Sequence, residues 1–116
     1  MLNLVGSRLS YHLSLLEKLG AFGNSPSVDI SNLLSVTREE DPWTTKVLRG
    51  IRSPGTGFPF VIMLGTLLHR NGKDFCVVYK RRPVLVLEFK NEKHQRWIIP
   101  ATPDSEELLS KVKLNS

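Results

Sequence analysis

The feature that most constrains the fold is an apolar run from Phe60 to Leu68 that carries no charged residue. Its residues are apolar at consecutive positions, which predicts a strand buried on both faces or curved around a barrel interior. Gly65 in the middle of the run is typical of a strongly bent strand. The pair Asn71-Gly72 favours a two-residue type I′ hairpin, so we expect the next strand to return antiparallel. Ile62 should then lie in the core, and Leu67, nearer the hairpin, should contribute less to stability.

The residues before this run predict strands and one short helix. Loose alternation and β-branched residues favour strands, and Ser14-Leu15-Leu16-Glu17 is a capping box that begins a helix ending at Gly20 or Gly23. A single helix over residues 8–19 is the competing prediction for the first segment. The strands are expected at Leu4–Leu13, at Val28–Thr37 with an irregularity near Asn32, and at Thr44–Ile51.

The residues after the run predict hairpin-linked strands and a C-terminal helix. The strands are expected at Phe75–Tyr79, Val84–Lys90 and Arg96–Pro100. Thr102 is a favoured N-cap and Pro103 suits the first helical position, so a helix should follow and extend to residue 112.

Together these elements are about seven strands and one amphipathic helix, with no alternation of strands and helices, which argues against a parallel sheet. We therefore predict a mainly β (α+β) fold. It is a curved antiparallel sheet, or partly open barrel, with the C-terminal helix capping one open end. This is the outline of a pleckstrin-homology-like (PH-like) barrel. The length of 116 residues suits a single PH-like domain over residues 1–116.

The sequence also resembles a family of small, mostly bacterial proteins without an assigned function. The shared pattern is D-P-W, then R-G-x-R-x-P-G-T-G-x-P, then G-T, then K-D-F before an apolar strand. Phe60 stands where the family pattern has glycine. The resemblance implies a PH-like fold and brings no activity, substrate or catalytic residue. The matching positions are Asp41, Pro42, Trp43, Arg49, Gly50, Arg52, Pro54, Gly55, Thr56, Gly57, Pro59, Gly65, Thr66, Lys73, Asp74 and Phe75.

The Pro/Gly-rich segment Ser53–Pro59 is the best candidate for a binding loop. Pro54-Gly55 predicts a type II turn, because proline fixes φ at the second position of the turn and glycine accepts a positive φ at the third. Two arginines flank the segment, and they either bind a ligand or pair with the carboxylates of residues 39–41 to fix a strand end. The candidate residues are Arg49, Arg52, Pro54, Gly55, Thr56 and Gly57.

The net charge of +5 is unevenly distributed: up to Thr44 there are three basic and five acidic residues, and after it thirteen and six. The basic half favours either an anionic partner or simply a well-solvated surface. Lys80, Arg81 and Arg82 at a predicted hairpin tip, with Arg96 nearby, are the candidate anion-binding residues, since lipid-binding PH domains hold phosphates with such groups. A solubilising hairpin tip is the alternative.

One pattern points to an enzyme. Asp74 with Glu88-Phe89-Lys90 is similar to the D…E-x-K pattern of metal-dependent nucleases, in which two carboxylates hold Mg²⁺ and the lysine orients water. However, residues two positions apart lie on the same face of a strand, so a glutamate and a lysine at this spacing are common on solvent-exposed strand faces. Cys76, between apolar neighbours, is predicted to be buried rather than a nucleophile. The three histidines show no metal-ligand spacing.

These observations favour a cytoplasmic, non-catalytic binding module without a cofactor or a metal. The N-terminal residues lack the apolar core of a signal peptide, and the longest apolar run is too short to span a bilayer. We expect a protein partner or a second copy of the chain, with an anionic membrane surface as the alternative. A nucleic-acid partner is disfavoured. Binding of nucleic acid would require exposed aromatic residues among the basic ones, and the candidates, Trp43 and Trp97, fit core positions equally well. The nuclease is the third interpretation.

Overall fold

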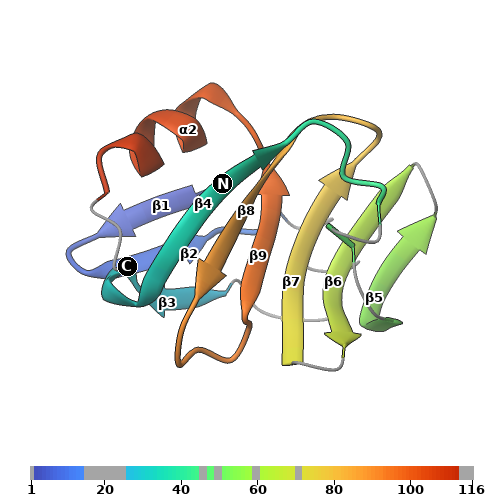
Figure 1. The fold of residues 1–116 in the computed structure, drawn as a ribbon, viewed down its shortest axis with the longest axis horizontal. Coiled ribbons are helices and arrows are strands. Elements are labelled where there is room, and N and C mark those ends of the chain that lie inside the picture. Colours follow the sequence, from blue (N-terminus) through green and yellow to red (C-terminus); the bar gives the residue numbers. More distant parts are fainter. Residues whose placement is uncertain are drawn as a thin grey trace.

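The computed structural model of the protein describes residues 2–14, 26–44, 47–48, 51–58, 61–69 and 72–112, and of residues 51–58 it describes the backbone. The described residues form nine strands in two sheets, and one α-helix (Figure 1). The smaller sheet has the order β1-β2-β3, with β1 at Leu2–Val5, β2 at Arg8–Tyr11 and β3 at Ser27–Asp29. The larger sheet has the order β4-β8-β9-β7-β6-β5, with β4 at Leu33–Glu39, β5 at Ile51–Phe58, β6 at Ile62–His69, β7 at Gly72–Tyr79, β8 at Val84–Phe89 and β9 at Arg96–Pro100. The helix α2 spans Pro103–Ser110.

The smaller sheet lies behind the larger one in Figure 1 and covers one of its faces, which we call the first face. The main hydrophobic core fills the space between them, because alternate residues of the central strands turn their apolar side chains to this side. Trp97 and Leu87 from the larger sheet and Leu9 from the smaller one are fully buried there. Burial of such large side chains is the main source of the stability of the fold.

Helix α2 follows the predicted pattern closely. The Thr102 side chain accepts a hydrogen bond from the Ser105 backbone N–H, and Pro103 begins the helix, as expected for an N-cap and its first position. Leu109 is buried in the main core, and Leu108 and Val112 pack against it. The helix therefore closes one end of the space beside the first face, next to β1 (Figure 1).

The apolar run forms β6, which pairs antiparallel with β7 as the hairpin prediction required. Gly65 is buried and adopts φ 119°, a value that favours glycine and allows the irregular pairing with β5 at this point. The predicted ranking of two side chains is wrong: Leu67 is buried, whereas Ile62 is only partly buried at the edge of the main core. Alternation turns Leu67 toward the opposite face, where it is covered by other apolar residues.

The predicted antiparallel, partly open barrel of about seven strands is only partly correct. The protein is mainly β with a C-terminal helix, but its strands form two sheets and not a closed barrel. One pair in the larger sheet is parallel, because β8 and β9 form an antiparallel hairpin and β9 then lies between β8 and β7. The lack of alternating strands and helices predicted no parallel pairing, but a parallel pair also arises where two consecutive strands, here β7 and β8, are not neighbours in the sheet.

Three predicted elements near the N-terminal side also differ from the structure. The strand expected at Leu4–Leu13 is the hairpin of β1 and β2, which turns at Gly6 with φ 60°, and this also overturns the alternative helix over residues 8–19. The irregularity expected near Asn32 is confirmed as a short 3-10 helix at Ile30–Asn32, but it divides the strand expected at Val28–Thr37 into two halves that join different sheets. The helix expected after Ser14 and the Asn71 half of the hairpin turn lie outside the described residues.

The strand expected at Thr44–Ile51 is wrong at Thr44, Val47 and Leu48, whereas Ile51 is the first residue of β5. Thr44, Val47 and Leu48 form a turn in which the Thr44 carbonyl accepts hydrogen bonds from the backbone N–H groups of Val47 and Leu48. The Thr44 hydroxyl also accepts from the Val47 N–H, the kind of local bond with which threonine competes against a strand. This turn places Val47 over the face of the larger sheet that the smaller sheet leaves uncovered.

Candidate functional site: a polar row and a cavity on the second face

The face of the larger sheet that is turned away from the smaller sheet, here called the second face, carries a row of polar residues. The pairing register places Ser35 of β4 opposite Glu88 of β8, Glu88 opposite Arg96 of β9, and Arg96 opposite Asp74 of β7. Residues in register on adjacent strands lie on the same face. Four neighbouring strands therefore bring together polar groups that are far apart in the sequence.

Asp74 and Arg96 form a buried ion pair within this row. The Arg96 Nε and Nη2 atoms both donate to Asp74 Oδ2, at 3.1 and 2.8 Å, and Asp74 is fully buried. His69 Nε2 lies 3.0 Å from the second carboxylate oxygen, Oδ1. Such a pair keeps its charges inside the protein only because each group is hydrogen-bonded, so the removal of one partner should be severely destabilising.

Arg96 also holds the turn that crosses the second face. Its Nη2 atom donates to the Val47 carbonyl oxygen at 2.8 Å. Around this contact Val47 packs in a second hydrophobic cluster with Leu67, Val86 and Ile98. One side chain thus connects the sheet, the buried carboxylate and the connection between β4 and β5.

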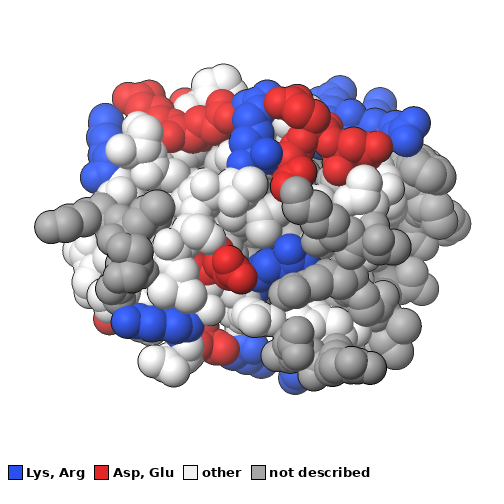
Figure 2. All heavy atoms as spheres, in the orientation of Figure 1, with Lys and Arg blue, Asp and Glu red and all other residues white. Residues whose placement is uncertain are grey.

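A cavity with a volume of about 270 Å³ opens beside this network, and we call it the β4 cavity. Alternate residues of strand β4 form one wall, because i, i+2 and i+4 positions share a face. Figure 2, which looks onto the second face, shows acidic and basic atoms side by side near its centre. The lining residues are Ser35, Thr37, Glu39, Val47, Val86, Glu88 and Arg96.

Among the residues that the structure describes, the lining of the β4 cavity carries two carboxylates and one basic group. The carboxylates belong to Glu39 and Glu88, and the basic residue, Arg96, forms an ion pair with Asp74. Glu88 Oε2 accepts a hydrogen bond of 3.1 Å from the Ser35 hydroxyl, which fixes the carboxylate against the wall formed by β4. The cavity can therefore hold a cationic group more favourably than an anionic one.

The predicted Pro/Gly-rich binding loop is not a loop. Residues Ile51–Phe58 form strand β5, which pairs with β6, and the register shifts between Arg52 and Gly55. A proline lacks an N–H donor, so it is tolerated only on an edge strand or at such an irregularity. Strand β5 is an edge strand with a register shift, and it can therefore pair with β6 although it contains proline and glycine. Arg52, Pro54, Gly55, Thr56 and Gly57 lie along β5, and Arg49 lies outside the described residues. Of the three carboxylates proposed as partners of these arginines, Glu40 pairs with Arg38 and Asp41 with Arg81. The proposed pairing itself involves side chains outside the described residues.

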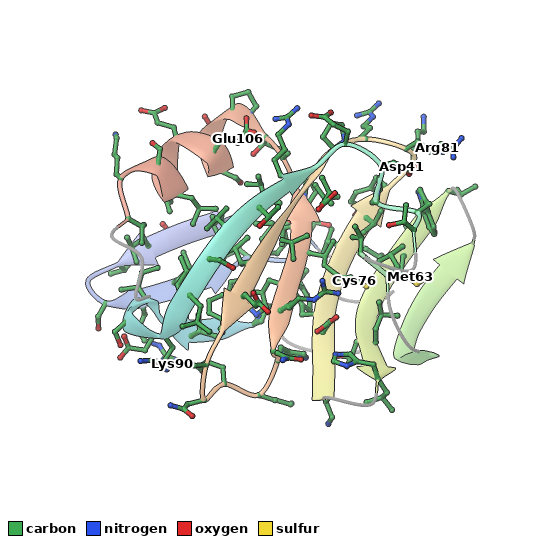
Figure 3. The ribbon with its side chains drawn as sticks, in the orientation of Figure 1. Asp41, Met63, Cys76, Arg81, Lys90 and Glu106 are labelled. Atoms are coloured by element: carbon green, nitrogen blue, oxygen red, sulfur yellow. The ribbon has the colours of Figure 1, made fainter. Side chains whose placement is uncertain are left out.

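The four candidate anion-binding residues are not brought together. Lys80, Arg81 and Arg82 are exposed at the connection between β7 and β8, whereas Arg96 is buried with Asp74. Arg81 Nη2 lies 3.3 Å from Asp41 Oδ2, and Figure 3 shows these two side chains next to each other. The Lys80 carbonyl accepts a hydrogen bond of 2.7 Å from the Trp43 indole. The basic turn is thus tied to the segment that follows β4.

The residues of the nuclease-like pattern do not form a metal site in the described part of the chain. Asp74 and Glu88 lie on the same face, but Arg96 stands between them on β9, where it neutralises Asp74. Lys90 is exposed just beyond the end of β8 that is opposite to Arg81 (Figure 3). Within the part of the chain that the structure describes, no group of three or more His, Cys, Asp or Glu residues is placed to hold a metal ion.

Two further titratable side chains have shifted pKa values: Cys76 is buried in the second hydrophobic cluster, and His94 is partly buried beside the first face. Burial raises the pKa of the Cys76 thiol to about 12, and the nearby Asp74 carboxylate adds to this effect, so the thiol stays protonated, as the prediction of a buried cysteine required. Burial lowers the pKa of His94 to about 4, with contributions from Lys93 and Lys73. His94 Nε2 lies 3.2 Å from the Thr66 hydroxyl, and its ring contacts the edge of Phe75.

The sequence named some of these residues but not the site. Asp74 and Glu88 were considered as metal ligands and Arg96 as part of a basic surface, whereas the structure joins them in one row. Ser35, Thr37 and Glu39 were missed as cavity residues. Ser35 and Thr37 lie two positions apart within the strand expected at Val28–Thr37, and Glu39 follows at the same spacing beyond its expected end, a pattern that indicates a shared polar face.

Compared with protein-family models, with curated proteins and with solved structures, the chain shows no match. The helix of the described residues is also too short to cross a membrane. The function is therefore inferred from the geometry of the second face.

Proposed function

We propose that this protein is a non-catalytic binding module that recognises a protein partner through the second face of its larger sheet. The observation that carries the proposal is the β4 cavity, which lies beside an edge strand and has the buried Asp74–Arg96 pair next to it. A buried ion pair costs desolvation energy, and one role that compensates for this cost is to hold a surface in a single conformation. A rigid floor beside an open edge strand suits recognition.

The hydrogen-bond pattern supports binding rather than catalysis. The Asp74 carboxylate is engaged through both oxygens, and the Cys76 thiol remains neutral. An acid-base catalyst needs a pKa near the working pH, and a cysteine nucleophile needs a thiolate. We also propose that the resemblance to the small bacterial PH-like proteins, which covers nearly the whole chain, reflects a common fold. A mainly β chain with a C-terminal helix that packs on the core supports this proposal.

The experiment is affinity capture from an extract of the source cell with matched variants. Thr37→Arg places a large side chain at the wall of the β4 cavity, whereas Ser7→Arg makes the same kind of change at an exposed turn of the smaller sheet. We expect a protein that is retained by the wild type and by Ser7→Arg but lost with Thr37→Arg. A partner that both variants retain equally would overturn the proposed face.

A vesicle experiment distinguishes the proposal from binding to an anionic membrane, for which Arg81 and Arg82 were the candidates. Flotation with phosphatidylserine vesicles should not retain the protein above the level found with neutral vesicles. Retention that falls with salt and is lost in Arg81→Ala/Arg82→Ala would replace the protein partner with a lipid surface.

A further inference from the structure

We infer that the β4 cavity takes a lysine or arginine side chain from an extended peptide segment that pairs with strand β4. This inference rests on the proposed function, because it names the chemistry of the partner that the second face recognises. It is carried by three features of the described residues: the position of β4 in the sheet, the volume of the cavity and the charge of its lining.

The first feature is the edge position of β4. Strand β4 stands at one end of the sheet order and pairs with β8, and no other strand of the described residues pairs with its outer side. An edge strand presents backbone N–H and C=O groups to which an extended peptide can add. Ser35, Thr37 and Glu39 of β4 line the cavity, so a peptide strand beside β4 would turn alternate side chains to the same face.

The second feature is the volume of about 270 Å³. Pockets for drug-sized ligands range from about 300 to 1,000 Å³, so this cavity falls below that class. A cavity of this size next to an edge strand suits a single long side chain, with the peptide backbone remaining outside at the strand. Recognition by strand addition uses side-chain pockets of this kind for specificity.

The third feature is the charge of the lining. Among the described lining residues, Glu88 contributes a carboxylate, and Arg96, the basic residue beside it, donates two hydrogen bonds to Asp74 and one to the Val47 carbonyl. Asp74, which pairs with Arg96, is not itself one of these lining residues. An incoming ammonium or guanidinium group would form charge-assisted hydrogen bonds with the Glu88 carboxylate, which the Ser35 hydroxyl already orients.

The test uses four pools of biotinylated pentapeptides with random flanking residues and a fixed middle residue, which is lysine, arginine, norleucine or glutamate. We expect the wild-type protein to bind the lysine and arginine pools about tenfold more tightly than the norleucine pool, as a hydrogen bond to a charged group requires. The glutamate pool should bind most weakly. Equal binding of all four pools, or binding of none of them, would overturn the inference.

Matched variants test whether the preference for basic peptides arises in the β4 cavity. Glu88→Gln should remove most of the preference for the basic pools, and Thr37→Arg should abolish binding of every pool. Glu107→Gln changes an exposed glutamate on α2 in the same way and should keep the preference. A preference that survives Glu88→Gln would show that the basic side chain binds elsewhere. If capture of a cellular partner still depends on Thr37 in that case, the proposed function stands and only the basic specificity fails.

Backbone methylation tests the strand addition itself. Along a strand, the N–H and C=O groups of one residue point to one side and those of its neighbours to the other. We therefore compare two further lysine pools, one N-methylated at the middle residue and one at the two residues beside it. Strand addition predicts that only one of these two pools loses binding. An equal effect of both modifications would contradict it.

Discussion

The two faces of the larger sheet are formed by the same strands but are stabilised in different ways. On the first face, large apolar side chains such as Trp97 and Leu87 pack against a second sheet and a helix. On the second face, a smaller apolar cluster surrounds a buried ion pair, and a single turn containing Val47 covers part of it. Apolar packing stabilises the fold but is not directional, whereas hydrogen bonds between charged groups require one specific geometry. The comparison suggests that the first face holds the fold together and the second face holds a site.

The largest expected effect comes from breaking the ion pair of the second face. Asp74→Asn should lower the free energy of unfolding by about 3 to 5 kcal/mol, because Arg96 would remain buried without a counter-charge. Asp104→Asn, in the exposed first turn of α2, should cost only about 0.5 kcal/mol. Urea unfolding followed by fluorescence measures both values.

A double variant sharpens this result. Asp74→Leu combined with Arg96→Met removes both charges and should recover most of the stability that Asp74→Asn loses, since buried ion pairs are often replaceable by apolar residues. We expect this variant to fold but to bind partners poorly, because the floor of the β4 cavity has changed. A double variant that is as unstable as Asp74→Asn would show that the two charges are not coupled.

Two substitutions in β6 compare apolar packing on the two faces directly. Leu67 faces the second face and is 3% exposed, whereas Ile62 is partly buried against the main core. Leu67→Ala should therefore cost about 2 to 4 kcal/mol and Ile62→Ala about 1 kcal/mol less, because the cost follows burial rather than the face. Denaturant melts of both variants measure the difference. A larger loss of unfolding free energy for Ile62→Ala would mean that packing on the first face contributes more to stability than packing on the second, even at the edge of the main core.

Gly65 tests the backbone that both faces share. Its φ of 119° lies in a region that residues with a side chain rarely adopt, and the residue is buried between β5 and β7. Gly65→Ala should cost about 1 to 3 kcal/mol, the range for a residue held in a sparsely populated conformation, and Gly65→Val should cost more because a β-branched side chain is stiffer. Unchanged thermal midpoints for both variants would contradict the assigned backbone conformation.

The smallest expected effect is the pH dependence contributed by His94 beside the first face. Its pKa in the folded protein is about 4, against 6.5 as the ordinary value, so between these values the unfolded chain binds more protons than the folded one. Stability should therefore fall as the pH is lowered from 6.5 to 4, by on the order of 1 kcal/mol once solvent screening of this partly exposed side chain is taken into account. His94→Gln should flatten the curve of unfolding free energy against pH in this window.

Much of the local structure follows from the sequence. The capped helix that begins after Thr102, the antiparallel pairing of β6 with β7 and the buried Cys76 all depend on neighbouring residues, and the structure contains each of them. The errors concern segments where local signals compete. The Pro/Gly-rich composition of residues 53–57 indicated a loop, but the hydrogen bonds available from β6 made it a strand.

The sequence by itself determined which segments are apolar, where most turns fall and how the chain ends in a helix. Only the tertiary structure decided that β9 lies between β8 and β7 and that Glu88, Arg96 and Asp74 form one row. The reason is physical: β7, β8 and β9 are all buried on both faces, so their residue patterns are alike and do not specify neighbours. The choice among such strands depends on packing and pairing over the whole sheet, and with it the position of every charged group on the second face.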